Sequence, residues 1–160
     1  MIPFERPWLL HPASVHFPVA LLTLGLVVFA LRLALPPLVH ERRAAVESAL
    51  DFSARWLLWL GTLSAWAALG LGLLAESTVP HVPAAWHMLH DHEAAAWWTV
   101  GFFTALSALR FWFDRQKPNR KLELAFLAAW LMAASVIVRT AWLGGELVYS
   151  HNVGTKAGQE

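Results

Sequence analysis

Histidines are the residues of this chain best suited to chemistry, and seven of the eight fall at or beyond predicted helix ends on one side of a bilayer. Imidazole binds haem iron, zinc and copper, and it titrates near neutral pH. A one-sided cluster of imidazoles beside hydrocarbon therefore favours a cofactor or metal site. The seven are His11, His16, His81, His87, His90, His92 and His151.

The composition is that of a membrane protein, and it predicts the helices that must position these histidines. Of the 160 residues, 58% are hydrophobic and 14% are charged, whereas soluble domains carry about 25% charged residues. Four apolar runs are each long enough to cross the hydrocarbon core, which takes about 20 helical residues. They cover approximately residues 15–35, 56–75, 94–113 and 122–143.

Short connections between these runs predict a single domain over residues 1–160, an all-α bundle of four transmembrane helices with antiparallel neighbours. The segment His40–Arg55 is expected to form a separate short helix on the cytoplasmic surface. Pro12 or Pro18 could each occupy the first turn of the first span; alternatively the helix runs through Pro18 and kinks. Gly144–Gly145 could break the fourth span near its end.

Basic residues indicate the orientation, because nine of the twelve flank the first and third connections. The positive-inside rule places such short basic loops in the cytoplasm. We therefore expect the N-terminus, the 76–93 connection and the C-terminus to lie outside, in a bacterial inner membrane with the histidines on the periplasmic side. The nine are Arg32, Arg42, Arg43, Arg55, Arg110, Arg115, Lys117, Arg120 and Lys121.

The chain has no cysteine, which excludes covalent c-type haem, iron–sulfur clusters, thiolate zinc and disulfides within it. The sequence also shows no Ser/His/Asp arrangement, phosphate-binding loop or basic nucleic-acid patch. Soluble-enzyme and nucleic-acid-binding functions are therefore not expected, and non-covalent haem or imidazole-bound metal remain.

The leading ligands are His16 and His92. His11 and His16 differ by about 140° in direction and about 7.5 Å in height on a helix, so they would not easily bind one metal. His16 is followed by Phe17 and an apolar run, while His92 opens the third span. Because the first and third helices enter from the same side, these two imidazoles are expected at matching depth, which predicts bis-imidazole ligation of a b-type haem.

The remaining histidines are given weaker roles. His11 and His151 are expected to form a second ligand pair or to support the first site. For His90, a ligand role and a solvated loop position are equally good interpretations. His81 and His87 are expected to lie in the solvated loop.

Arg139 is the one basic residue well inside a predicted span, about 25 Å along the fourth helix and level with the histidines. Its guanidinium could pair with haem propionates. Alternatively it could pair with Glu146, Glu93 or Asp91, or extend outward to water. The second span carries small residues at one helical spacing, a face that allows close helix packing or admits a planar macrocycle. These are Gly61, Ala65, Ala68 and Gly72.

Two motifs, HPASVHFPVALL near the start and GGELVYSHNVG near the end, resemble a bacterial family of small four-span membrane proteins catalogued as a domain of unknown function. Its patterns are HP-x3-HFP and GGELVY-x-HG. The resemblance implies a four-helix membrane fold, and some relatives occur beside cytochrome c-like modules, which suits electron transfer. Asn152 stands where the family has glycine, and Asn tolerates a left-handed backbone better than most residues.

The first functional hypothesis is a membrane b-type cytochrome with one or two haems near the periplasmic face. A single haem layer cannot relay electrons across about 30 Å of hydrocarbon, so its partner would be a quinol or a periplasmic cytochrome. The second is a copper or zinc protein using His16, His92, His11 and His151, although the absence of cysteine and the scarcity of methionine count against Cu(I) trafficking. The third is a non-catalytic subunit of a membrane complex, or of a homo-oligomer, whose histidines are structural or sense pH. Whether the protein is an enzyme is left open.

Overall fold

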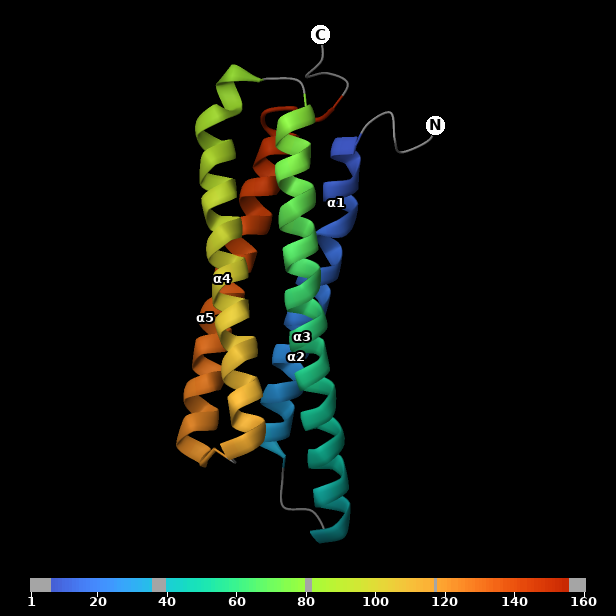
Figure 1. Cartoon of the computed structure of the whole chain (residues 1–160), viewed down its shortest axis with the longest axis vertical. Helices are drawn as coiled ribbons and strands as arrows, with labels where there is room; N and C mark the ends of the chain where they lie inside the picture. Colours follow the sequence, from blue (N-terminus) through green and yellow to red (C-terminus); the bar gives the residue numbers. More distant parts are fainter. Residues whose placement is uncertain (1–6, 36–39, 80–81, 117, 156–160) are drawn as a thin grey trace.

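The computed structural model describes residues 7–35, 40–79, 82–116 and 118–155, which are helical almost throughout and contain no strand. Four long helices lie side by side along one axis (Figure 1). The α-helices are α1 (Leu10–Ser14), α2 (His16–Ala34), α3 (His40–Thr78), α4 (Trp86–Gln116) and α5 (Arg120–Tyr149). Short 3₁₀ turns at Pro7–Leu9 and Pro83–Ala85 precede α1 and α4.

Three stretches within the described residues are long and apolar enough to cross a membrane: Leu10–Ala34, Arg42–Thr78 and Arg120–Tyr149. α4 has 31 residues, enough length to span, but it does not meet the same apolar criterion. Its tryptophans and the charged residues at both of its ends lower its hydropathy, and tryptophan prefers the membrane interface to the core. Four long helices are thus present, but only three of the four expected spans are clear candidates in this part of the chain.

The expectation of a separate surface helix at His40–Arg55 is wrong. This segment is continuous with the second span in α3, a single helix of 39 residues that extends beyond its neighbours in Figure 1. No proline or glycine interrupts residues 40–60, and the segment is rich in strong helix formers. Ion pairs of Asp51 and Arg55 with α2 and α4 also fix it against the bundle.

The chain enters the bundle through a nearly continuous helix that is interrupted only by a turn at Val15. The Val15 amide donates to the His11 carbonyl at 3.1 Å, so α1 leads directly into α2. Pro18 lies inside α2 and has no N–H for the Ser14 carbonyl. Pro12 and Pro18 are the third residues of α1 and α2, so each lies in the first turn of its own helix, and the two helices follow one another across the turn at Val15.

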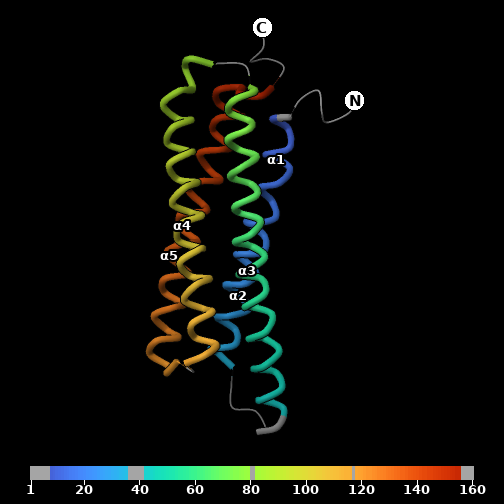
Figure 2. Tube along the Cα trace, viewed as in Figure 1, coloured from blue at the N-terminus to red at the C-terminus, as the bar shows by residue number. Residues whose placement is uncertain are grey.

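The core differs between the two ends of the bundle. At the end where α4 gives way to α5, aromatic rings pack edge to face, with Phe126 centred 5.3 Å from Phe29 and 5.8 Å from Trp130. At the other end the core between α3 and α4 is small, with Ala65, Leu69 and Val100 packed against Ala96. The end with small residues is where α1, the start of α4 and the end of α5 meet (Figure 2).

Gly61 and the Gly144–Gly145 pair differ in their effect on the helices that contain them. A Cβ at Gly61 would lie 2.6 Å from Leu22 Cδ2, so this part of the small-residue face packs α3 closely against α2. Gly144–Gly145 do not break the helix, because α5 continues to Tyr149. Beyond it, Asn152 has φ of 57°, a left-handed backbone that asparagine tolerates better than most residues.

Candidate functional site

His11 of α1 and His92 of α4 face each other at the end of the bundle that has the small core. Their ring centroids are 6.1 Å apart, and the ring planes are inclined by 73°. Both side chains are half-buried. Two imidazoles 81 positions apart in the chain are thus brought into one site.

His11 is held by the backbone of α3. Its Nδ1 lies 2.9 Å from the carbonyl oxygen of Ala68. A carbonyl oxygen only accepts hydrogen bonds, so Nδ1 carries the proton and donates it. In the neutral ring this leaves the lone pair of Nε2 available to a metal.

His92 is held in the same way by α5. Its Nδ1 lies 3.0 Å from the carbonyl oxygen of Thr140. The Thr140 hydroxyl lies 2.9 Å from the hydroxyl of Thr99 on α4 and donates to the Val136 carbonyl, also at 2.9 Å. These bonds tie α4 to α5 beside the imidazole and fix the carbonyl that orients it.

A glycine lies one helical turn beyond each accepting carbonyl. A Cβ at Gly72, four residues after Ala68, would lie 3.0 Å from His11 Cε1. A Cβ at Gly144, four residues after Thr140, would lie 3.1 Å from His92 Cε1. We use the name histidine seat for an accepting carbonyl together with the glycine four residues after it. One histidine seat lies on α3 and the other on α5.

The structure does not bring His16 to His92. His16 begins α2 with an exposed side chain, and the ring that faces His92 is that of His11. Both histidines lie near the expected end of the bundle, but residue spacing does not fix the direction in which each side chain points. Since the two differ by about 140° around the helix, only one of them can point between the helices.

The other candidate residues lie around the pair. His90 is exposed, with its ring centred 5.0 Å from that of Trp86 and its Nδ1 3.9 Å from Glu93. His87 is exposed beside Asp91. His151 lies half-buried in the turn after α5 and makes no hydrogen bond or ring contact with His11 in the described residues. His81 lies outside the described residues.

Arg139 is exposed on α5, directly before Thr140, and forms no ion pair within the described part of the chain. The acidic residues considered as its partners have other contacts. Glu146 accepts from the Ser150 hydroxyl, and Glu93 accepts from the Trp97 indole at 3.3 Å. The guanidinium therefore remains available to an external carboxylate.

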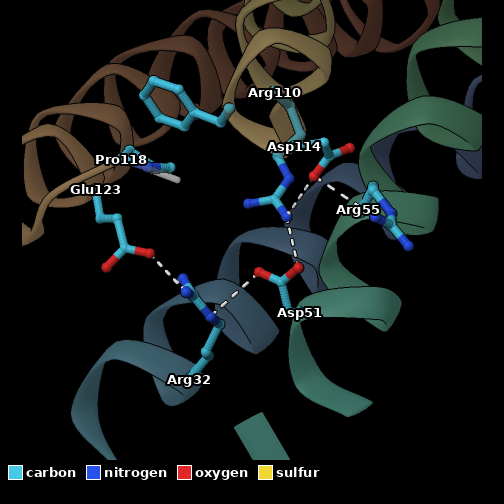
Figure 3. Close-up of a pocket in the computed structure, with 8 residues that line it drawn as sticks. Arg32, Asp51, Arg55, Arg110, Asp114, Pro118 and Glu123 are labelled. Carbon is cyan, nitrogen blue, oxygen red and sulfur yellow. Dashed lines mark hydrogen bonds and ion pairs between the residues drawn. The ribbon is translucent and has the colours of Figure 1, made fainter. Parts of the chain in front are cut away.

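Sequence reasoning missed a network of ion pairs at the opposite end of the bundle (Figure 3). Arg32 pairs with Asp51 at 3.2 Å and with Glu123, while Arg110 pairs with Asp51 and, at 3.0 Å, with Asp114. Arg55 also lies 3.5 Å from Asp114. These arginines had been interpreted only as topology signals. Asp51, Asp114 and Glu123 do lie near the ends of predicted spans, but this clustering does not indicate which helices meet.

An all-helical bundle with long apolar helices and an inward-facing histidine pair defines a multi-helix membrane protein, which associates with the lipid bilayer. The chain belongs to the family described as predicted membrane protein (DUF2231), whose profile matches residues 8–157. This confirms the resemblance seen in the two terminal motifs. No curated protein and no solved structure matches the chain.

Proposed function

We propose that the protein is a membrane b-type cytochrome-like protein in which His11 and His92 would hold a haem iron. The observation that carries this proposal is the separation of 6.1 Å between the two ring centroids. A metal held about 2 Å from one nitrogen of each imidazole places the two ring centres about 6 Å apart.

The donor set fits this group. Imidazoles that bind metals donate their other N–H to a carbonyl or carboxylate, which fixes the ring and raises its basicity. Both histidine seats supply such a carbonyl at 2.9–3.0 Å. With no cysteine in the chain, the haem is held non-covalently.

The number of ligands favours haem over a bare metal ion. In the described residues, no group of three His, Asp or Glu side chains is arranged to bind a metal. Structural zinc sites use four ligands, whereas a haem macrocycle itself supplies four and needs only the two axial imidazoles. Copper or zinc held by the same pair is the alternative.

The surroundings suit a planar macrocycle. The side chains between α3 and α4 near the histidines are small, in contrast to the aromatic cluster at the other end. Arg139 is exposed beside the seat on α5 and has no ion pair among the described residues. A guanidinium in this position would pair with the haem propionates through charge-assisted hydrogen bonds.

In the proposed orientation α4 also crosses the membrane, as the third of four spans, both termini lie outside, and the histidine pair lies on the periplasmic side of a bacterial inner membrane. It rests on the nine basic residues around the first and third connections. When bound, the haem supplies one-electron transfer. The histidine pair lies at one end of the bundle, so its redox partner would be a quinol or a periplasmic cytochrome on that side.

The test is the absorption spectrum of detergent-purified protein, oxidised and then reduced, after expression with adequate haem supply. We expect a six-coordinate low-spin b-type spectrum and about one haem per chain in a pyridine haemochrome assay. Absence of haem under these conditions would refute the proposal. Copper and zinc analysis of the same sample then tests the alternative.

A further inference from the structure

We propose that the bundle has a second binding site, at the end opposite the histidines, for a phospholipid head group that carries a phosphate and a primary ammonium. A cavity of about 400 Å³ lies there among the ion pairs, between the ends of α2, α4 and α5 and the side of α3 (Figure 3). We call it the basic-end pocket; its charged lining residues are Arg32, Asp51, Arg55, Arg110, Asp114 and Glu123. This inference is independent of the haem proposal.

The first argument is a set of buried donors without acceptors. Arg32 Nη1, Arg55 Nε and Arg110 Nε are all buried and have no hydrogen-bond partner. The Arg110 side chain is only 8% exposed. Leaving a charged donor buried and unpaired is costly. Three such donors around one cavity call for a ligand with several acceptor oxygens, and guanidinium groups match phosphate well.

The second argument is charge balance, since the lining contains three arginines and three carboxylates. A lone anion would add uncompensated charge to a partly buried site, whereas a zwitterion would not. The ion pairs of Asp114 and Glu123 use Oδ1 and Oε1, so the second oxygen of each can accept from an ammonium group. A phosphoethanolamine head group supplies both charges.

The third argument is depth. α2 ends at Ala34, α4 ends at Gln116 and α5 begins at Arg120, so the pocket lies where helices leave the membrane core. Trp56, next to Arg55, and Trp112, two residues after Arg110, are both exposed. Tryptophans are enriched at the membrane interface, so two exposed tryptophans beside the pocket fit this depth. The volume also falls in the range of about 300–1,000 Å³ that is typical of ligand sites.

The experiment measures the thermal unfolding of delipidated protein in detergent with added phosphatidylethanolamine, phosphatidylcholine, phosphatidylglycerol or inorganic phosphate. Native mass spectrometry counts the bound lipids. We expect phosphatidylethanolamine to raise Tm most, with saturation at about one lipid per chain, because phosphatidylcholine has no ammonium N–H to donate. We expect inorganic phosphate to give no comparable shift.

Conservative variants test the donors directly. Arg55→Lys and Arg110→Lys keep a cation beside Asp114 but remove the unpaired Nε–H. Each should weaken the binding of phosphatidylethanolamine about tenfold, the value of one charge-assisted hydrogen bond. If the Arg110→Lys variant does not fold, the Arg55→Lys variant still tests the role of the arginine donors. Arg43→Lys is the matched control, because Arg43 forms only a half-exposed pair with Glu47 on α3.

Several outcomes would overturn the proposal. Equal stabilisation by the three lipids, or unchanged lipid binding in Arg55→Lys, would show that the network is only an ionic clamp between helices. Stronger binding of phosphatidylglycerol would refute the argument from charge balance. Stabilisation by inorganic phosphate alone would show that the ligand is a soluble anion and not a lipid.

Discussion

The imidazoles of His11 and His92 are supported by the same arrangement on two different helices, and they face each other at a centroid separation of 6.1 Å. On α3 the Ala68 carbonyl accepts from His11 and Gly72 makes room for the ring; on α5 Thr140 and Gly144 do the same for His92. In each ring, Nδ1 donates its proton to a backbone carbonyl. In each neutral ring the lone pair of Nε2 is left unused by this bond.

Alanine substitution of single histidines distinguishes the role of the His11–His92 pair from that of the histidines around it. If His11 and His92 hold a haem as proposed, His11→Ala and His92→Ala should each lose the haem or give a high-spin spectrum. His16→Ala and His87→Ala alter exposed side chains and should leave the spectrum unchanged. The measurement is the ratio of haem to protein together with the reduced spectrum. Loss of haem in His16→Ala but not in His11→Ala would support the pairing expected from the sequence.

The histidine-rich end of the bundle could be predicted from the sequence, but the ligand pair could not. Residue spacing gives the height of a side chain along a helix, and on this basis His92 was placed near a histidine of the first helix. Direction depends on how the helix is rotated against its neighbours, and here the turn at Val15 and Pro18 intervene. His11, considered as a second-pair or supporting residue, therefore takes the inward position.

The ion-pair network could not be predicted for a similar reason. Arg32 and Asp51 lie on different helices, and nothing in their spacing indicates that they meet. The positive-inside rule counts Arg and Lys and gives little weight to acids, so Asp114 and Glu123 were overlooked. The limits of α3 were also missed, because a hydropathy pattern marks the apolar part of a helix and not its whole length.

The basic residues still predict the orientation of the bundle. A reporter active only in the cytoplasm should be silent when fused after Glu160 and active when fused after Pro118, in the basic connection between α4 and α5. The reason is the cost of translocating short loops rich in Lys and Arg. Activity of the Glu160 fusion would reverse the orientation and place the histidine pair on the cytoplasmic side.

Arg110→Ala should strongly destabilise the protein, because Asp51 and Asp114 would lose their most buried partner. Breaking a buried pair from one side costs about 3–5 kcal/mol. Thermal unfolding in detergent measures the loss. Arg43→Ala removes a half-exposed pair on α3 and should change stability by at most about 0.5 kcal/mol. Similar effects of the two substitutions would show that the network contributes little.

The glycines of the two histidine seats should be needed for the cofactor and not for the fold. Alanine at Gly72 would place its Cβ 3.0 Å from His11 Cε1 and 3.2 Å from Nδ1, so the ring must shift and its bond to the Ala68 carbonyl must lengthen. Alanine at Gly144 acts in the same way on His92. Loss of an orienting partner of a metal ligand typically weakens metal binding about 10–100-fold, and we expect losses of this size in haem titrations of both variants.

Gly70→Ala on α3 and Gly101→Ala on α4 are matched controls, because a Cβ at either position meets nothing within 4 Å. Alanine is favoured over glycine in a helix by up to about 1 kcal/mol, which offsets the weakened imidazole hydrogen bond at Gly72 and Gly144, so all four variants should keep the haem-free fold about as well as the parent. A drop in haem affinity without a drop in haem-free Tm, at Gly72 and Gly144 alone, therefore indicates that the seats position the imidazoles. If Gly72→Ala binds haem as tightly as Gly70→Ala, the packing of His11 against Gly72 has no part in ligation, and the candidate site must be sought elsewhere in the bundle.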